Sequence, residues 1–171
     1  MSQEDQAGFD IVRLYTKNAS LESPNAPESF NVRGNPDIQI QLSNEERNVE
    51  EDFYEVTLKI TVTAKMEKQV LFIAEVEQAG LFVLAGFTEE QRNHLKGAYC
   101  PNILYPYVRK ALDDLITSAG FPPVVLAPLN FEAIYAERQA QIAANQEGDE
   151  KAKKEDKKDT KKSEKKKKVD A

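Results

Sequence analysis

Residues 53–64 read FYEVTLKITVTA and show the clearest alternation in the chain. One side of this stretch is apolar, and it comprises Tyr54, Val56, Leu58, Ile60, Val62 and Ala64. The other side is polar, and it comprises Glu55, Thr57, Lys59, Thr61 and Thr63. A period of two with one apolar side is typical of a β-strand that buries one face.

Three further stretches predict strands around this one. Ile38, Ile40 and Leu42 alternate with polar residues, and a weaker pattern runs from Phe9 to Tyr15, with Val12 and Leu14 on one face. Val70–Gln78 follows the central strand after only five residues, 65–69, which favours an antiparallel hairpin. Between the first two strands, Pro24 and Pro27 disfavour both helix and sheet, so the chain is expected to leave the sheet there and cross over.

The second half of the chain has helical periodicity. Apolar residues recur at spacings of three and four from Leu104 to Ile116, and Gly120 predicts the end of that helix. Pro101 and Pro106 indicate that the helix begins near one of them or is kinked there. Asn130 is a suitable N-cap for a second helix. The order predicts an α+β fold, a four-stranded antiparallel sheet followed by two helices.

Charge divides the chain of 171 residues, whose net charge is −6, into a body and a tail. Residues 147–171 hold 11 Lys and 8 Asp+Glu, which leaves 12 basic and 21 acidic side chains in residues 1–146. We expect a disordered N-terminus (1–8), one domain (9–144) and a disordered Lys/Glu-rich tail (145–171). The acidic body argues against nucleic-acid binding.

Other classes of protein are disfavoured by what the sequence lacks. No apolar run is long enough to span a membrane, the first ten residues do not resemble a secretory signal, and the single Cys100 excludes an internal disulfide. We expect a cytoplasmic protein that is not embedded in the membrane. His94 and Cys100 have no partners of a catalytic or metal-binding motif nearby, so we expect no enzyme, no metal and no cofactor.

Two proline-containing loops hold apolar residues outside the predicted elements. One loop contains Phe30 and Val32, and the other runs from Phe121 to Leu129. These loops could fold down to cap the sheet, or they could line an open groove that holds extended apolar chains. The pattern alone leaves both interpretations open.

Five motifs in order resemble the SecB family of bacterial protein-export chaperones. They are YTK (15–17), SPNAP (23–27), YEV with TVTA (54–64), GAYCPNILYPY (97–107) and LAPLNF (126–131). The resemblance implies a homotetramer, built as a dimer of dimers, that binds unfolded precursor proteins, keeps them competent for translocation and delivers them to the export motor SecA. It also implies no catalysis and no cofactor.

The resemblance assigns roles to individual residues. Glu22, Ile73 and Glu75 match positions that contact SecA, and Asn18 stands where family members often have Asp. Ala74, Val76 and Gln78 match positions used in tetramer assembly. For the groove that binds clients, we expect Ile38, Ile40, Leu42, Phe121, Val124, Leu126, Phe131, Ile134 and Tyr135.

Three alternatives remain open at this point. The first is a general antifolding or toxin–antitoxin-associated chaperone of the same fold that does not dock on a motor. The second is a structural adaptor that oligomerises and uses its apolar loops internally. The third is an enzyme of unknown type, for which the sequence offers no assembled site.

Overall fold

The computed structural model describes residues 7–144, which form two compact units. The first unit ends at Phe131, the first residue of a helix over residues 131–144, and the rest of that helix belongs to the second unit. Each unit is described by itself. The expectations for residues 1–6 and 145–171 lie outside the described residues.

The first unit contains one antiparallel sheet of four strands in the order β1-β4-β3-β2. Its strands are β1 (Gly8–Glu22), β2 (Asp37–Glu50), β3 (Phe53–Met66) and β4 (Gln69–Ala85). All four predicted strands are confirmed, and each is longer than its alternating stretch. The polar second half of β2 is strand because it pairs with β3 as far as Glu50, opposite Phe53.

Two tight turns and one crossover connect the strands. Two residues separate β2 from β3, and two separate β3 from β4, so the predicted short hairpin is confirmed. β1 and β2 lie at opposite edges, and residues 23–36 cross between them through the short 3-10 helix η1 (Glu28–Asn31). Ser23 Oγ and Asn25 Nδ2 donate to the carbonyls of Leu71 and Val70, which holds this crossover against the start of β4.

The first predicted helix begins earlier than expected. It is one helical run of α1 (Glu89–His94), the π-helical turn η2 (Leu95–Tyr99) and α2 (Cys100–Ser118), and Pro106 lies inside it. Thr88 and Gln91 form a capping box: Thr88 Oγ1 accepts from Gln91 N–H at 3.3 Å, and Gln91 Oε1 accepts from Thr88 N–H at 2.9 Å. This start signal is present in the sequence, and the prediction from the prolines missed it.

The predicted end of this helix is confirmed at Gly120, whose φ is +88°. Gly120 N–H donates to the Thr117 carbonyl at 3.0 Å, and Phe121 N–H donates to the Ile116 carbonyl at 3.2 Å. These two bonds form a Schellman motif, which requires a left-handed residue at the glycine position. The second predicted helix is also present, over residues 131–144.

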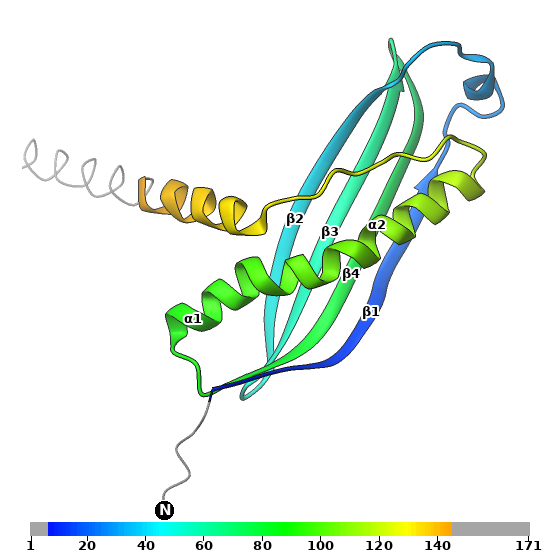
Figure 1. Cartoon of the computed structure of the whole chain (residues 1–171). Helices are drawn as coiled ribbons and strands as arrows, with labels where there is room; N and C mark the ends of the chain where they lie inside the picture. Colours follow the sequence, from blue (N-terminus) through cyan, green and yellow to red (C-terminus); the bar gives the residue numbers. More distant parts are fainter. Residues whose placement is uncertain (1–6, 145–171) are drawn as a thin grey trace, which may run out of the picture. The chain divides into compact units, whose positions relative to one another are not determined.

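The helical run covers one face of the sheet (Figure 1). That face carries the fully buried side chains of β3, which are Val56, Leu58, Ile60, Val62 and Ala64. They pair with Gly80, Gln78, Val76, Ala74 and Phe72 of β4. We call the opposite face of the sheet the open face, and Glu55, Lys59, Glu75 and Glu77 lie on it.

Candidate functional site

The residues assigned to SecA docking lie together on the open face. In the register of β1 and β4, Glu22 pairs with Ile73, and Asn18 pairs with Glu77. Glu75 lies between these pairs on β4. We call Asn18, Glu22, Ile73, Glu75 and Glu77 the acidic strip, since three of its five members are carboxylates. The sequence prediction did not include Glu77.

A β-bulge in β1 brings Asn18 to this face. The register shifts by one residue between Thr16 and Asn18, so Lys17 is the extra residue. Without the bulge, strict alternation would place Tyr15 and Asn18 on opposite faces. A second shift between Ile11 and Arg13 leaves Val12 in a bulge without a partner on β4.

Lys59 connects the two carboxylates of β4. Its Nζ lies 2.9 Å from Glu75 Oε1 and 3.2 Å from Glu77 Oε1. Thr61 Oγ1 donates to Glu75 Oε2 at 3.0 Å, so both oxygens of Glu75 have a donor within the subunit. The hydrogen bond from Lys59 holds the pKa of Glu75 below its usual value, and the bonds to Glu75 and Glu77 raise the pKa of Lys59.

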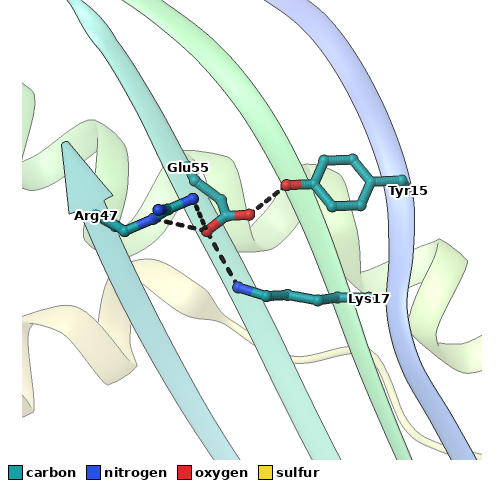
Figure 2. Close-up of polar contacts among 4 residues, drawn as sticks. All are labelled: Tyr15, Lys17, Arg47 and Glu55. Atoms are coloured by element: carbon teal, nitrogen blue, oxygen red, sulfur yellow. Dashed lines mark hydrogen bonds and ion pairs between the residues drawn. The ribbon is translucent and has the colours of Figure 1, made fainter. Parts of the chain in front are cut away.

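Glu55 is the centre of a second cluster on the open face (Figure 2). Its side chain is only 6% exposed, and it accepts from Lys17 Nζ at 3.1 Å and from Arg47 Nε at 3.2 Å. Tyr15 donates its hydroxyl to the other carboxylate oxygen. From the sequence we predicted only that Glu55 points away from the apolar face. Its three partners could not be predicted, because they lie on the other strands β1 and β2.

This cluster shifts the pKa values of its members. The hydrogen bond from Tyr15, with those from Lys17 and the Arg47 charge, outweighs the effect of burial and lowers the pKa of Glu55. Burial, together with the bond to Glu55, raises the pKa of Tyr15 to about 12. At neutral pH the Glu55 carboxylate is therefore ionised and the Tyr15 hydroxyl is protonated, and the cluster links β1, β2 and β3.

The apolar surface predicted for client binding is partly exposed. Ile40 on the edge strand β2 is 51% exposed, and Ile38 and Leu42 are half-buried on the same side. Phe30 is 51% exposed, although its ring stacks on Phe121 at 4.9 Å between centroids. These side chains fit a surface that could receive apolar segments.

Three of the residues predicted for the client groove are buried. Phe121, Leu126 and Phe131 are all less than 10% exposed. Their place in the client groove stays a prediction. Phe121 packs on Phe72, and Phe131 packs edge-on against Tyr105, whose hydroxyl donates to the Ala127 carbonyl at 2.5 Å. The loop thus caps the core through these side chains.

The rest of the same loop remains accessible. Val125 is 86% exposed, and the half-buried Val124 lines a groove of about 450 Å³ between α2 and the loop. Its other walls include Arg109, Lys110 and Asp113. The buried residues of the loop fit the capping interpretation, and client binding in the groove stays a prediction. Ile134 and Tyr135 lie on the helix of the second unit, half-buried.

The residues assigned to tetramer assembly lie in the core of the subunit. Ala74 and Val76 are fully buried, and Gln78 is 4% exposed, on the face that α2 covers. Gln78 Oε1 accepts from the Thr16 hydroxyl at 2.9 Å. These side chains pack within the subunit, and their role in tetramer assembly stays a prediction.

The structure places the two residues considered for chemistry in different surroundings. Cys100 is fully buried, and burial raises the pKa of its thiol to about 12, so it is a thiol and not a thiolate at neutral pH. His94 lies exposed at the end of α1. Within residues 7–144, no group of three or more His, Cys, Asp or Glu side chains could hold a metal ion. The same part of the chain has no helix with the length and apolar character needed to cross a membrane.

Comparison with known proteins shows to which family the chain belongs. The sequence profile of the family described as preprotein translocase subunit SecB matches residues 2–142. The chain belongs to the SecB family. The resemblance inferred from the five motifs is thus confirmed over most of the chain.

Several SecB relatives are similar over nearly their whole length. The protein-export protein SecB of Nitrosococcus oceani is 48% identical over 141 residues, which cover 81% of this chain and 86% of the relative. The protein-export protein SecB of Neisseria meningitidis serogroup B is 46% identical over 145 residues, covering 84% and 99%.

A solved structure has the same fold. It is a SecB-like chaperone of Mycobacterium tuberculosis in complex with a peptide from the HigA1 antitoxin. The TM-score is 0.59 at 18% sequence identity, and the match covers 71% of this chain and 90% of that one. This similarity supports the predicted fold class.

Proposed function

We propose that this chain, a protein-export chaperone of the SecB family, binds unfolded precursors on one surface and docks on SecA through another. The acidic strip of the open face is the docking surface, with Glu22, Ile73 and Glu75 in the roles that the family resemblance assigns. The protein acts in the cytoplasm by binding, without catalysis or a cofactor.

The observation that carries the docking proposal is the meeting of Asn18, Glu22, Ile73 and Glu75 on one face. These residues come from two strands that are 51 or more residues apart in sequence, yet the β1–β4 register aligns them. An acidic surface with one apolar residue suits a basic partner segment that also brings an apolar side chain. Such an interaction weakens as salt screens the charges.

Client binding is proposed for the exposed apolar side chains of the helix-bearing side. Ile40, Phe30 and Val125 are each more than half exposed, and Ile38, Leu42 and Val124 complete the proposed surface of the first unit. In the second unit, Ile134 and Tyr135 are proposed separately as client contacts. A chaperone that binds the unfolded state delays folding by mass action. Several weak apolar contacts along one long client add up by avidity, so no single deep site is needed.

We further propose a homotetramer, a dimer of dimers, in which Ala74, Val76 and Gln78 act indirectly. These side chains lie on the sheet face that α2 covers, so they would affect assembly through the position of that helix. The apolar and aromatic side chains exposed on the unit, among them Val12, Tyr99 and Tyr107, support burial against other subunits.

Two measurements on the purified full chain test this function. The chain should slow the refolding of a denatured precursor, and it should bind SecA with an affinity that falls as salt rises. If the precursor refolds as fast in the presence of the chain as in its absence, the chaperone role is refuted. Delayed refolding without salt-sensitive SecA binding would favour the general antifolding chaperone over the export chaperone.

A further inference from the structure

Lys59 neutralises part of the acidic strip from within the same subunit. Its ammonium group lies within 3.2 Å of carboxylate oxygens of both Glu75 and Glu77. Glu77 is its direct partner across the β3–β4 ladder, and Glu75 is the diagonal neighbour. Because Thr61 takes the second oxygen of Glu75, this carboxylate already has an internal donor at each oxygen.

The position of this contact distinguishes it from an ordinary surface ion pair. The side chains of Lys59, Glu75 and Glu77 are 34%, 26% and 24% exposed. In the Lys110–Asp114 pair of α2, both side chains are more than 60% exposed. Ion pairs that are partly buried are screened less by water and salt, so the Lys59 contacts persist where the Lys110 contact is weak.

We propose that Lys59 is an internal competitor for the basic partner that docks on the acidic strip, and that it sets the affinity and selectivity of docking. This inference rests on the proposed function. A cation that approaches Glu75 has to displace or share the ammonium group of Lys59. An isolated Lys or Arg therefore gains little, since it exchanges one ion pair for another.

A partner gains more when it also contacts the rest of the strip. Ile73 offers an apolar contact, and Glu22 is exposed at the end of β1 opposite it. Lys59 thus favours a partner that combines charge with an apolar side chain over any basic stretch. Basic segments of an unfolded client would otherwise occupy the docking surface, so this selectivity keeps the strip available.

The test is Lys59→Met, which keeps an unbranched side chain of similar length and removes the charge. SecA binding is measured by isothermal titration at two salt concentrations. We expect binding to be about two- to tenfold tighter at low salt, with a steeper salt dependence. Lys110→Met is the matched control, because it also removes one lysine from an ion pair, and it should change SecA binding by less than about twofold.

A decalysine peptide tests selectivity, since it brings charge without an apolar contact. Its binding should rise by a larger factor than that of SecA in Lys59→Met. In the Glu75→Gln background, the gain from Lys59→Met should shrink, because one of the two carboxylates that it releases is no longer charged. Equal gains in both backgrounds would contradict a role through Glu75.

The outcomes separate this inference from the function on which it rests. Unchanged or weaker SecA binding by Lys59→Met, or an equal gain in Lys110→Met, overturns the competitor role and leaves docking intact. Absence of SecA binding by the unaltered chain overturns both. If Lys59→Met does not fold by circular dichroism, Lys59→Gln is measured in its place with the same expected results.

Discussion

Glu55 shows how much one buried carboxylate depends on its partners. Lys17 and Arg47 are themselves exposed, so their charges can be satisfied by water, whereas the Glu55 carboxylate is 6% exposed. Removing its partners would leave a desolvated charge, and removing the carboxylate would leave two like charges close together. The cluster therefore stabilises the pairing of β1 and β2 with the two central strands.

We predict that Glu55→Gln lowers the free energy of unfolding by about 1–3 kcal/mol at pH 7. Urea unfolding followed by circular dichroism measures this loss. Tyr15→Phe is the milder comparison, with an expected loss of about 0.5–1.5 kcal/mol, because it removes one hydroxyl donor and no charge. A loss in Tyr15→Phe greater than that in Glu55→Gln would contradict the central role of the carboxylate.

The pH dependence of this stabilisation follows from the lowered pKa of Glu55. The stabilisation is fully present above the ordinary value of 4.5 and is lost as the pH falls through the lower folded-state pKa. We therefore predict that the difference in unfolding free energy between the unaltered chain and Glu55→Gln narrows below pH 4.5. A difference that stays constant from pH 7 to pH 3 would contradict this linkage.

At Gly120 the backbone conformation determines how much a substitution costs. Its φ of +88° is strained for any residue with a side chain, and an added Cβ would lie 3.4 Å from the Phe30 ring. We predict that Gly120→Ala lowers the free energy of unfolding by about 1 kcal/mol. The control is Ser118→Ala, two residues earlier on the exposed surface of the helix. It should change the free energy of unfolding by less than about 0.5 kcal/mol.

At the scale of elements, the reliability of the sequence prediction depended on how regular each strand is. β3 has unbroken alternation through its apolar face, so its position, partner and buried side were all predictable. β1 has two register shifts, and each reverses the side on which the following residues lie. A period-of-two analysis could not find that Asn18 and Glu22 share a face with Tyr15.

In the candidate site, too, some features could be predicted from the sequence and others could not. Family resemblance identified Glu22, Ile73 and Glu75, but only the strand register brings Lys59 next to Glu75, 16 positions later. The burial of Phe121, Leu126 and Phe131 was equally hidden, because apolar residues in a loop are compatible with a cap or a groove. Contacts between distant segments decide such cases, and single-sequence patterns do not contain them.

Val76 tests the link between the sheet and α2. It is fully buried beneath that helix, and Val76→Ala leaves a cavity. We predict a loss of about 1–3 kcal/mol in the free energy of unfolding. The oligomer should also dissociate at protein concentrations at which the unaltered chain stays assembled. Val83→Ala, at a half-buried site of the same strand, should cost less in both measurements.

Light scattering and urea unfolding on the same samples distinguish direct from indirect action at Val76. Dissociation with unchanged stability of the folded subunit would mean that Val76 contacts another subunit, contrary to its position in the core. Loss of stability without any change in the oligomer would mean that α2 is not part of the assembly surface. The expected result is that both quantities change together.

At the scale of the whole molecule, the two proposed activities use opposite sides of one sheet. The acidic strip lies on the open face, whereas Ile38, Ile40 and Leu42 pair with the β3 residues of the helix-covered face. A client held on one side therefore does not have to leave before the motor docks on the other. This separation makes it possible to remove either activity without the other.

We predict that Glu75→Lys and Ile40→Asp have complementary effects. Glu75→Lys places a second cation beside Lys59 and should weaken SecA binding by about tenfold or more, with refolding of a denatured precursor still delayed. Ile40→Asp puts a charge on an exposed apolar surface, so it should shorten that delay while SecA binding stays within about twofold. Light scattering should give both variants the mass of the unaltered chain. If either variant loses SecA binding and refolding delay together at unchanged mass, the two activities share one surface, and a sheet with one face for each cannot explain them.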